Sequence, residues 1–247
     1  MNILFKKKNM KKVGDNIKSS IGAFNFAGNV HKSFEKHVKK SVPFYEEGHD
    51  IICKLSSFFL VNKSVVYDLG CSTGKLTRKI SEYNQDLQIK IYGIDSEPKM
   101  IKHSSKLLNK KTKKRISYKK GELTNIKFKK SDLIISYYTI QFIKPKFRQK
   151  IFDKIYKSLN YGGAFVLFEK VRGNDARFQD IFTQIYHEFK HDQGFSKDQI
   201  YNKAASIRGV LEPFTSEANV DYMKRAGFKD ITTIIKYCSF EGFLAIK

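Results

Sequence analysis

A short acidic and glycine-rich turn interrupts the apolar run that begins at residue 65. Residues 65–74 read VVYDLGCSTG, so Asp68 lies at the end of the run, Gly70 and Gly74 frame the turn, and helical spacing resumes at Lys75. A carboxylate accepts hydrogen bonds, and glycines let a backbone approach a ligand without a Cβ in the way. We therefore expect a ligand at this turn.

Two phosphate-binding motifs do not fit this turn. A P-loop needs four residues between its glycines and a hydroxyl residue after its lysine, whereas three residues separate Gly70 from Gly74, and Leu76 follows Lys75. A dinucleotide loop needs glycine at positions 72 and 75, which are Ser72 and Lys75. The pattern (D/E)xGxGxG forms the loop after the first strand with which class I methyltransferases bind S-adenosylmethionine. It fits this turn with one substitution, Ser72 for the middle glycine.

Further candidates follow the next predicted strands. Asp95 ends the run IYGID, where its carboxylate can accept hydrogen bonds from two ribose hydroxyls. Caps on the following helices explain Asp68 or Asp95 singly, but not both together with the glycine turn. We expect the adenine and sulfonium ends of the cofactor to meet two pairs of residues, Glu122-Leu123 and Tyr137-Tyr138. Candidates for a base are Tyr138, Glu169 and His187, although packing, capping and surface exposure explain each equally simply.

The elements that must position these residues alternate along the chain. Strand-like runs occupy 65–69, 89–94, 133–136, 164–169, 231–236 and 240–246, with helix-like segments at 75–84, 97–109 and 146–159. This alternation predicts a Rossmann-like α/β fold with a mostly parallel sheet of seven strands. Three residues between the last two runs require an antiparallel hairpin. We also expect two helices joined at SVPFY within a cap at 26–60, a helical insertion at 172–218, and a flexible basic N-terminus at 1–25.

Composition limits the remaining possibilities. The 247 residues carry a net charge of +23, with lysine clusters at 110–120 and 127–130, so binding of nucleic acid stays open; lysine-rich codon usage explains the excess equally well. The three cysteines lie far apart without ligand spacing, so we expect reduced thiols and no metal site. No apolar stretch approaches the ~20 residues that cross a bilayer, so we expect a cytoplasmic protein.

From Phe26 onward the chain resembles the carboxy-S-adenosylmethionine synthases, methyltransferase-fold enzymes of tRNA wobble-uridine modification. The likeness rests on the segments SVPFY, VYDLGCS, IDSEPKMI, TIQFI, IFDKIYKSLNYGGAFVLFEK and HEFKHDQGFS and on the closing AGF with its hairpin. It implies a homodimer and a single domain at 26–247. It also implies that S-adenosylmethionine, or its carboxylated or demethylated form, contacts Tyr45, Gly70-Cys71-Ser72, Asp95-Ser96 and Glu122-Leu123.

Two positions depart from that family. Ala204 stands where the family holds the extra carboxylate of its cofactor with an arginine, and Tyr137 replaces an asparagine. Arg208 lies one helical turn later and substitutes for the arginine only if it faces the same way. We therefore expect methyl transfer to a small-molecule acceptor, with carboxyl transfer from prephenate to the cofactor as the alternative. A third hypothesis, an RNA-binding module that keeps the cofactor fold, rests on the basic clusters.

Overall fold

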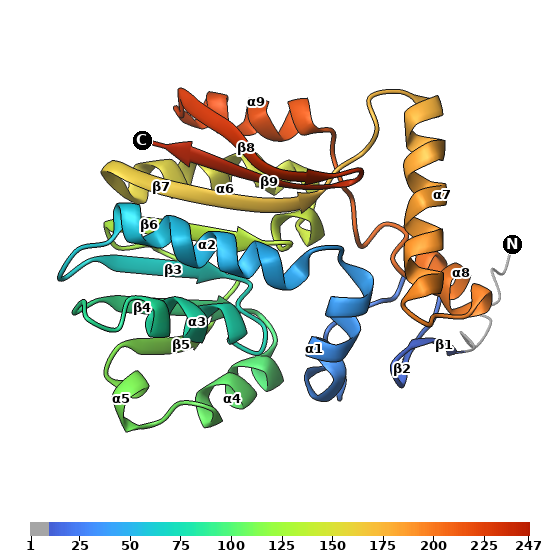
Figure 1. Ribbon diagram of the computed structural model, residues 1–247, viewed down its shortest axis with the longest axis horizontal. Coiled ribbons are helices and arrows are strands. Elements are labelled where there is room, and N and C mark those ends of the chain that lie inside the picture. The colour runs from blue at the N-terminus through green and yellow to red at the C-terminus, as the bar shows by residue number, and fades with distance from the viewer. Residues whose placement is uncertain (1–9) are drawn as a thin grey trace, which may run out of the picture.

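A central seven-stranded sheet, covered by helices on both faces, forms the body of the protein in the computed structural model, which describes residues 10–247 (Figure 1). The strand order is β5-β4-β3-β6-β7-β9-β8, and all neighbouring pairs are parallel except those of β9. The strands are β3 (Val65–Leu69), β4 (Lys90–Asp95), β5 (Ile116–Lys120), β6 (Ser131–Tyr137), β7 (Leu159–Lys170), β8 (Asp230–Tyr237) and β9 (Phe240–Ile246). The predicted fold class and the antiparallel C-terminal hairpin are confirmed.

Helices pack apolar side chains against each face of this sheet. On one face Ile52 and Ile80 meet strand residues such as Val66, and on the other Phe152 and Met223 meet residues such as Phe165. Removal of this apolar surface from water is the main term that stabilises the sheet. The helices are α1 (Val30–Ser41), α2 (Tyr45–Phe59), α3 (Lys75–Tyr83), α4 (Pro98–Lys106), α5 (Lys110–Lys113), α6 (Pro145–Ser158), α7 (Ala176–Asp192), α8 (Lys197–Ser206) and α9 (Ser216–Ala226), with a 3₁₀ turn at Ile140–Phe142.

The cap consists of α1 and α2, joined as expected at residues 42–44. Pro43 cannot continue α1, and Phe44 takes a left-handed conformation with a φ of 54° that turns the chain into α2. The insertion after β7 supplies α7 and α8, which stand beyond the carboxyl end of the sheet (Figure 1). Cap and insertion therefore lie on either side of the region where ligands bind in open α/β sheets.

The N-terminal segment differs from the expected mobile lead-in. Residues 1–9 lie outside the described part, but β1 (Lys11–Gly14) and β2 (Ile17–Ser19) form an antiparallel hairpin. Val13 and Ile17 are buried with Phe24 in a small cluster of their own, and the hairpin packs on α8. Burial of these three side chains orders the segment despite its lysine-rich sequence.

No helix within residues 10–247 has the length and apolar character that a membrane crossing requires.

Candidate cofactor and substrate site

A cavity of about 490 Å³ lies at the carboxyl ends of the parallel strands, between the cap and the insertion. Its volume falls within the range of roughly 300–1,000 Å³ that is typical of small-molecule sites. Eleven residues predicted from the sequence line it: Tyr45, Asp68, Gly70, Cys71, Ser72, Asp95, Ser96, Glu122, Leu123, Tyr137 and Tyr138. The fold thus brings together residues from four strand ends and the start of α2, although their contact with a cofactor stays a prediction.

The glycine turn and Asp95 are joined by backbone hydrogen bonds. The Ser72 amide donates to Asp95 Oδ2 at 2.9 Å, and the Glu97 amide donates to Asp95 Oδ1 at 2.8 Å. Each carboxylate oxygen keeps a second acceptor site, so Asp95 can still receive two ribose hydroxyls. Burial raises the pKa of Asp95, whereas the two amide bonds act in the opposite direction. These donor and acceptor positions fit the nucleoside end of S-adenosylmethionine.

The glycines of the turn have a structural reason that the sequence did not reveal. A Cβ at Gly70 would lie 2.2 Å from Thr139 Oγ1, and a Cβ at Gly74 would lie 2.2 Å from the Tyr118 hydroxyl oxygen. Both glycines also have positive φ angles, which favour glycine. Close protein packing, in addition to any approach of a ligand, therefore requires glycine here. Gly74 itself does not line the cavity.

Asp68 is fully buried beneath the turn. Thr77 Oγ1 of α3 donates to Asp68 Oδ2 at 2.5 Å and ties the end of β3 to the helix that follows the loop. Burial raises the pKa of Asp68 to about 6, and the bond from Thr77 opposes this shift. Asp68 also borders the cavity, so a ligand that offers a cation or a hydrogen-bond donor would stabilise its charged form.

Tyr137 projects from the end of β6 into α2. Its hydroxyl donates to the Tyr45 backbone oxygen at 2.7 Å, and its ring packs against Tyr45 and His49. The phenol fits because position 48 is glycine: a Cβ there would lie 2.3 Å from the hydroxyl oxygen. Gly48 and Tyr137 therefore act as a matched pair that closes the cap side of the cavity.

The next residue, Tyr138, has a φ of 55°, which is a strained conformation for a bulky side chain. Its amide donates to the Phe168 carbonyl at 2.8 Å, which holds this conformation at the end of β6. Burial raises the pKa of the Tyr138 hydroxyl, and the nearby Glu169 acts in the same direction. A phenol with a raised pKa stays protonated, so Tyr138 is better suited to shaping the cavity than to removing a proton.

The other two candidate bases do not reach the cavity. Alternation along β7 turns Glu169 to the face of Phe165 and Leu167, where burial raises its pKa to about 8 and Arg148 partly offsets the shift. His187 is exposed on α7. Neither residue lines the cavity, so their proposed role as base is not supported by their placement.

Three lysines line the insertion side of the cavity, one buried (Lys190) and two half-buried, and no motif in the sequence marks them. Lys170 ends β7, Lys190 lies on α7 and Lys203 on α8. The ammonium groups of Lys170 and Lys190 lie 4.2 and 4.4 Å from the centroid of the Tyr186 ring. Lys203 Nζ lies 3.0 Å from the centroid of the Phe24 ring.

Within residues 10–247 these three lysines form no ion pair with a carboxylate. Burial lowers the pKa of Lys170 to about 8 and that of Lys190 to about 7, and it also lowers the pKa of Lys203; each lysine feels a further positive neighbour. Aromatic faces stabilise an ammonium group only in part. An anionic ligand would supply the missing counter-charge.

Ala204 and Arg208 line a different, smaller cavity. Arg208 lies beyond the end of α8, so it does not replace an arginine at position 204 within the main cavity.

The two lysine clusters meet outside the cavity. Lys119 and Lys129 place their ammonium groups 5.3 and 5.7 Å from the centroid of the Tyr92 ring. No residue of 110–120 or 127–130 lines the cavity.

Sequence comparison identifies relatives along nearly the whole chain. A family profile described as "Methyltransferase domain" matches residues 66–163. The carboxy-S-adenosyl-L-methionine synthase of Campylobacter lari is 36% identical over 91% of this chain and 94% of its own. The synthase of the same name from Staphylococcus epidermidis is 38% identical over 87% of this chain and 92% of its own.

Solved structures with low sequence identity share the fold. Human N-acetylserotonin methyltransferase in complex with SAM has a TM-score of 0.55 at 16% identity, covering 91% of this chain and 60% of its own. An O-methyltransferase family protein from Burkholderia thailandensis has a TM-score of 0.63 at 12% identity, covering 88% and 59%. The fold is therefore that of the class I S-adenosylmethionine-dependent methyltransferases.

Proposed function

The chain belongs to the carboxy-S-adenosyl-L-methionine synthase family of S-adenosylmethionine-dependent transferases, and we propose that it moves a one-carbon group between this cofactor and a small anionic molecule. The observation that carries the proposal is the cluster of Lys170, Lys190 and Lys203 at the end of the cavity away from Asp95 and Glu122. Buried and half-buried ammonium groups without carboxylate partners favour an anion, so the second molecule carries a carboxylate or a phosphate.

The first candidate reaction is transfer of the methyl group to that small-molecule acceptor. The cofactor supplies an activated methyl group, and the protein contributes alignment and exclusion of water. Asp95 and Glu122 would hold the nucleoside, Tyr45 and the glycine turn would hold the amino-acid end, and the lysines would orient the acceptor. Ala204 stands where the family resemblance implies an arginine for the extra carboxylate, and the lack of that arginine favours this candidate over retention of a carboxylated cofactor.

The second candidate is carboxyl transfer from prephenate to the cofactor. Its product would be the carboxy-S-adenosyl-L-methionine in the name of the relatives. Identity of 36–38% over about nine tenths of the chain favours it. The same lysine cluster would bind the carboxylates of prephenate. This candidate would place the protein in tRNA wobble-uridine modification in the cytoplasm, without direct contact to nucleic acid.

Mass spectrometry separates the two candidates. The protein is incubated with S-adenosylmethionine and, in parallel, prephenate or a panel of small carboxylates and phosphates. S-adenosylhomocysteine together with a methylated acceptor supports the first candidate. Rapid, prephenate-dependent formation of carboxylated cofactor would overturn the first and support the second. Turnover with neutral acceptors only would contradict both, because neither would then need the lysines.

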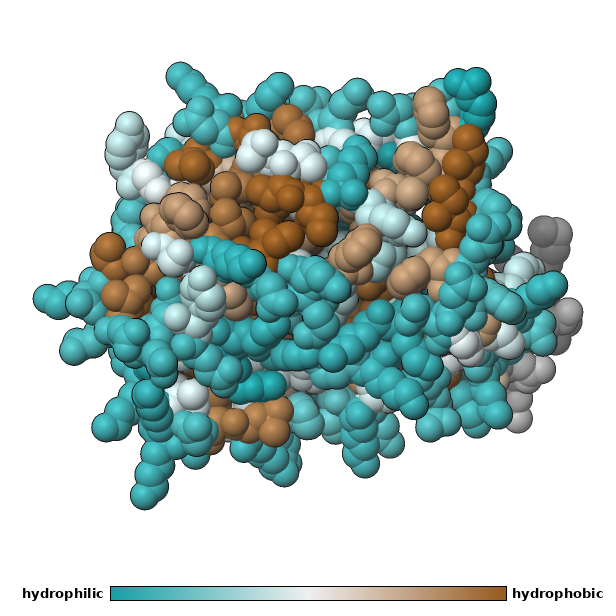
Figure 2. All heavy atoms as spheres, viewed as in Figure 1, coloured by the Kyte–Doolittle hydropathy of each residue, from teal (hydrophilic) through white to brown (hydrophobic). Residues whose placement is uncertain are grey.

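We also propose a homodimer. Lys190 is the one buried residue of α7, whereas Phe178 and Ile181 on this helix are 42% and 46% exposed. Figure 2 shows hydrophobic residues gathered over α7 and over the region of α2 and β8. Contact between two copies would remove such apolar surface from water. Light scattering after size exclusion tests the proposal, and a monomer at micromolar concentration would contradict it.

A further inference from the structure

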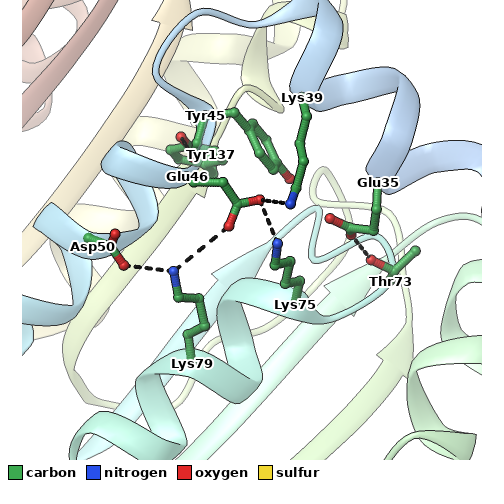
Figure 3. Close-up of polar contacts among 9 residues, drawn as sticks. All are labelled: Glu35, Lys39, Tyr45, Glu46, Asp50, Thr73, Lys75, Lys79 and Tyr137. Atoms are coloured by element: carbon green, nitrogen blue, oxygen red, sulfur yellow. Dashed lines mark hydrogen bonds and ion pairs between the residues drawn. The ribbon is translucent and has the colours of Figure 1, made fainter.

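Two ammonium groups converge on one carboxylate oxygen beside the glycine turn (Figure 3). Lys75, the first residue of α3, places Nζ 2.5 Å from Glu46 Oε1. Lys39 of α1 places Nζ 2.9 Å from the same oxygen. Glu46 lies on α2, directly after Tyr45, so cap and glycine turn are joined at this point.

Carboxylates hold the ammonium groups of this cluster in place. Lys79 lies 2.7 Å from Asp50 Oδ1 and only 3.9 Å from Glu46 Oε2, so Asp50 neutralises it. Lys39 and Lys75 share Glu46, and the carboxylate of Glu35, which accepts a hydrogen bond from Thr73 of the turn, also acts on Lys39. Partial burial would raise the pKa of Glu46, but the bonds from Lys75 and Lys39 outweigh this and lower it to about 2. Glu46 is therefore ionised at any physiological pH, and it holds the ammonium group of Lys75 beside the glycine turn.

Lys75 is the lysine of this cluster that borders the cavity. Lys75 lines it, whereas Lys39, Glu46 and Lys79 do not. An ammonium group has three donors, and Glu46 uses one donor of Lys75. The Lys75 side chain is 26% exposed, so its remaining donors are accessible to a ligand in the cavity.

The polarity of the cavity indicates which part of the cofactor lies there. Asp95 and Glu122, at the ends of β4 and β5, suit the nucleoside. The cavity continues past the glycine turn toward α2, where Tyr45 and Lys75 line it. With the nucleoside at Asp95 and Glu122, the amino-acid end of S-adenosylmethionine would lie beside Lys75. We propose that Lys75 binds the α-carboxylate of the cofactor, with Glu46 and Lys39 as residues that position its ammonium group.

This inference rests on the identity of the cofactor and is independent of the second substrate. A hydrogen-bonded contact between opposite charges predicts that Lys75→Gln weakens binding of S-adenosylmethionine about 10- to 100-fold. Decarboxylated S-adenosylmethionine keeps the nucleoside, the sulfonium and the amine but lacks the carboxylate. The affinity for this ligand is expected to change less than about twofold in Lys75→Gln, because the ligand has no carboxylate that Lys75 could bind.

Calorimetric titration of both ligands, on the wild type and each variant, tests the proposal. Lys79→Gln is the matched control, one turn along α3 beside the same glutamate, and is expected to change neither affinity. Lys75→Arg keeps the charge and is expected to retain most of the difference in affinity between the two ligands. This variant therefore still tests the proposal if Lys75→Gln folds poorly. Equal weakening of both ligands by Lys75→Gln, or no weakening of either, would overturn the proposal. A wild type that binds neither ligand would instead contradict the assigned cofactor.

Discussion

Replacement of Lys190 by methionine is expected to stabilise the protein and, at the same time, to weaken binding of its second substrate. Lys190 is buried on α7 beside Tyr186, and the titratable groups of other elements that interact with it are Lys170, Lys203 and His37. Burial lowers the pKa of His37 to about 4, so this imidazole is neutral at pH 6 and above. Methionine fills a similar volume without a charge. Removal of an uncompensated buried amine takes away a term that opposes folding.

The magnitude follows from the pKa of Lys190, which burial lowers from 10.5 to about 7. At about 1.4 kcal/mol per pH unit, this corresponds to a cost of about 4–5 kcal/mol for carrying the charge in the folded protein. Relaxation and water in the cavity reduce this figure, so Lys190→Met is expected to gain about 1–3 kcal/mol near pH 6.

The lowered pKa of Lys190 also determines how the stability of the folded protein changes with pH. The folded protein binds fewer protons at Lys190 than the unfolded chain between pH 7 and 10.5, so the stability of the wild type rises with pH in this window. The cost is fully present below about pH 7 and is lost as the pH approaches 10.5. The advantage of Lys190→Met must therefore shrink from pH 6 to pH 9.

Urea unfolding of wild type and Lys190→Met at pH 6, 7.5 and 9 measures this difference. Lys197→Met, an exposed change in the same insertion, is the control and is expected to stay within about 0.5 kcal/mol of wild type. A small dicarboxylate is expected to raise the melting temperature of the wild type more than that of Lys190→Met. A less stable variant at pH 6, or a gain independent of pH, would refute the reasoning on the lysine cluster.

Three further changes address the cofactor side of the cavity. Asp95→Ala is expected to weaken binding of S-adenosylmethionine about 100-fold or more, because two hydrogen bonds to a charged group are lost. Unchanged affinity in calorimetry would show that Asp95 does not bind the ribose. Ser72→Gly relieves a φ of 49° and is expected to add up to about 1 kcal/mol in thermal unfolding, whereas Ser57→Gly, within α2, should lose about that amount. Gly48→Ala is expected to cost about 1–3 kcal/mol in the wild type and less in Tyr137→Phe, since the clash is with the hydroxyl; equal costs in both backgrounds would contradict the pairing.

Periodicity in the sequence predicted most of the sheet because buried parallel strands consist of continuous apolar runs. The same signal failed for β5, an edge strand of sequence ISYKK in which only Ile116 is buried. It failed again for the β1–β2 hairpin, whose lysine-rich strands bury little besides Val13 and Ile17. Short strands with few buried positions do not produce a readable pattern.

Motif spacing placed Asp68, Asp95 and Glu122 on one cavity because each lies at or just beyond the carboxyl end of a parallel strand, and such strand ends meet at one edge of the sheet. The same reasoning selected Glu169 at the end of β7, but strand alternation assigns the cavity to its neighbour Lys170. In a sequence so rich in lysine, a lysine at a strand end indicates a solvated surface, so sequence reasoning selects the neighbouring acid instead. Burial of a lysine depends on what packs over it, and this is decided by α7 and α8 far along the chain.

The cavity that results has carboxylates at one end and amines at the other. Asp68, Asp95 and Glu122 favour a ligand that offers donors or a positive charge, whereas Lys170 and Lys190 favour an anion. A neutral acceptor would leave the lysines uncompensated, so it would bind more weakly than an anion of the same size. The strained conformations of Ser72 and Tyr138 further oppose folding without a ligand. Ligands that bind only the folded state offset such terms, by about 2.7 kcal/mol at a hundred times their dissociation constant. Cofactor and anion together should therefore stabilise this protein more than either one does alone.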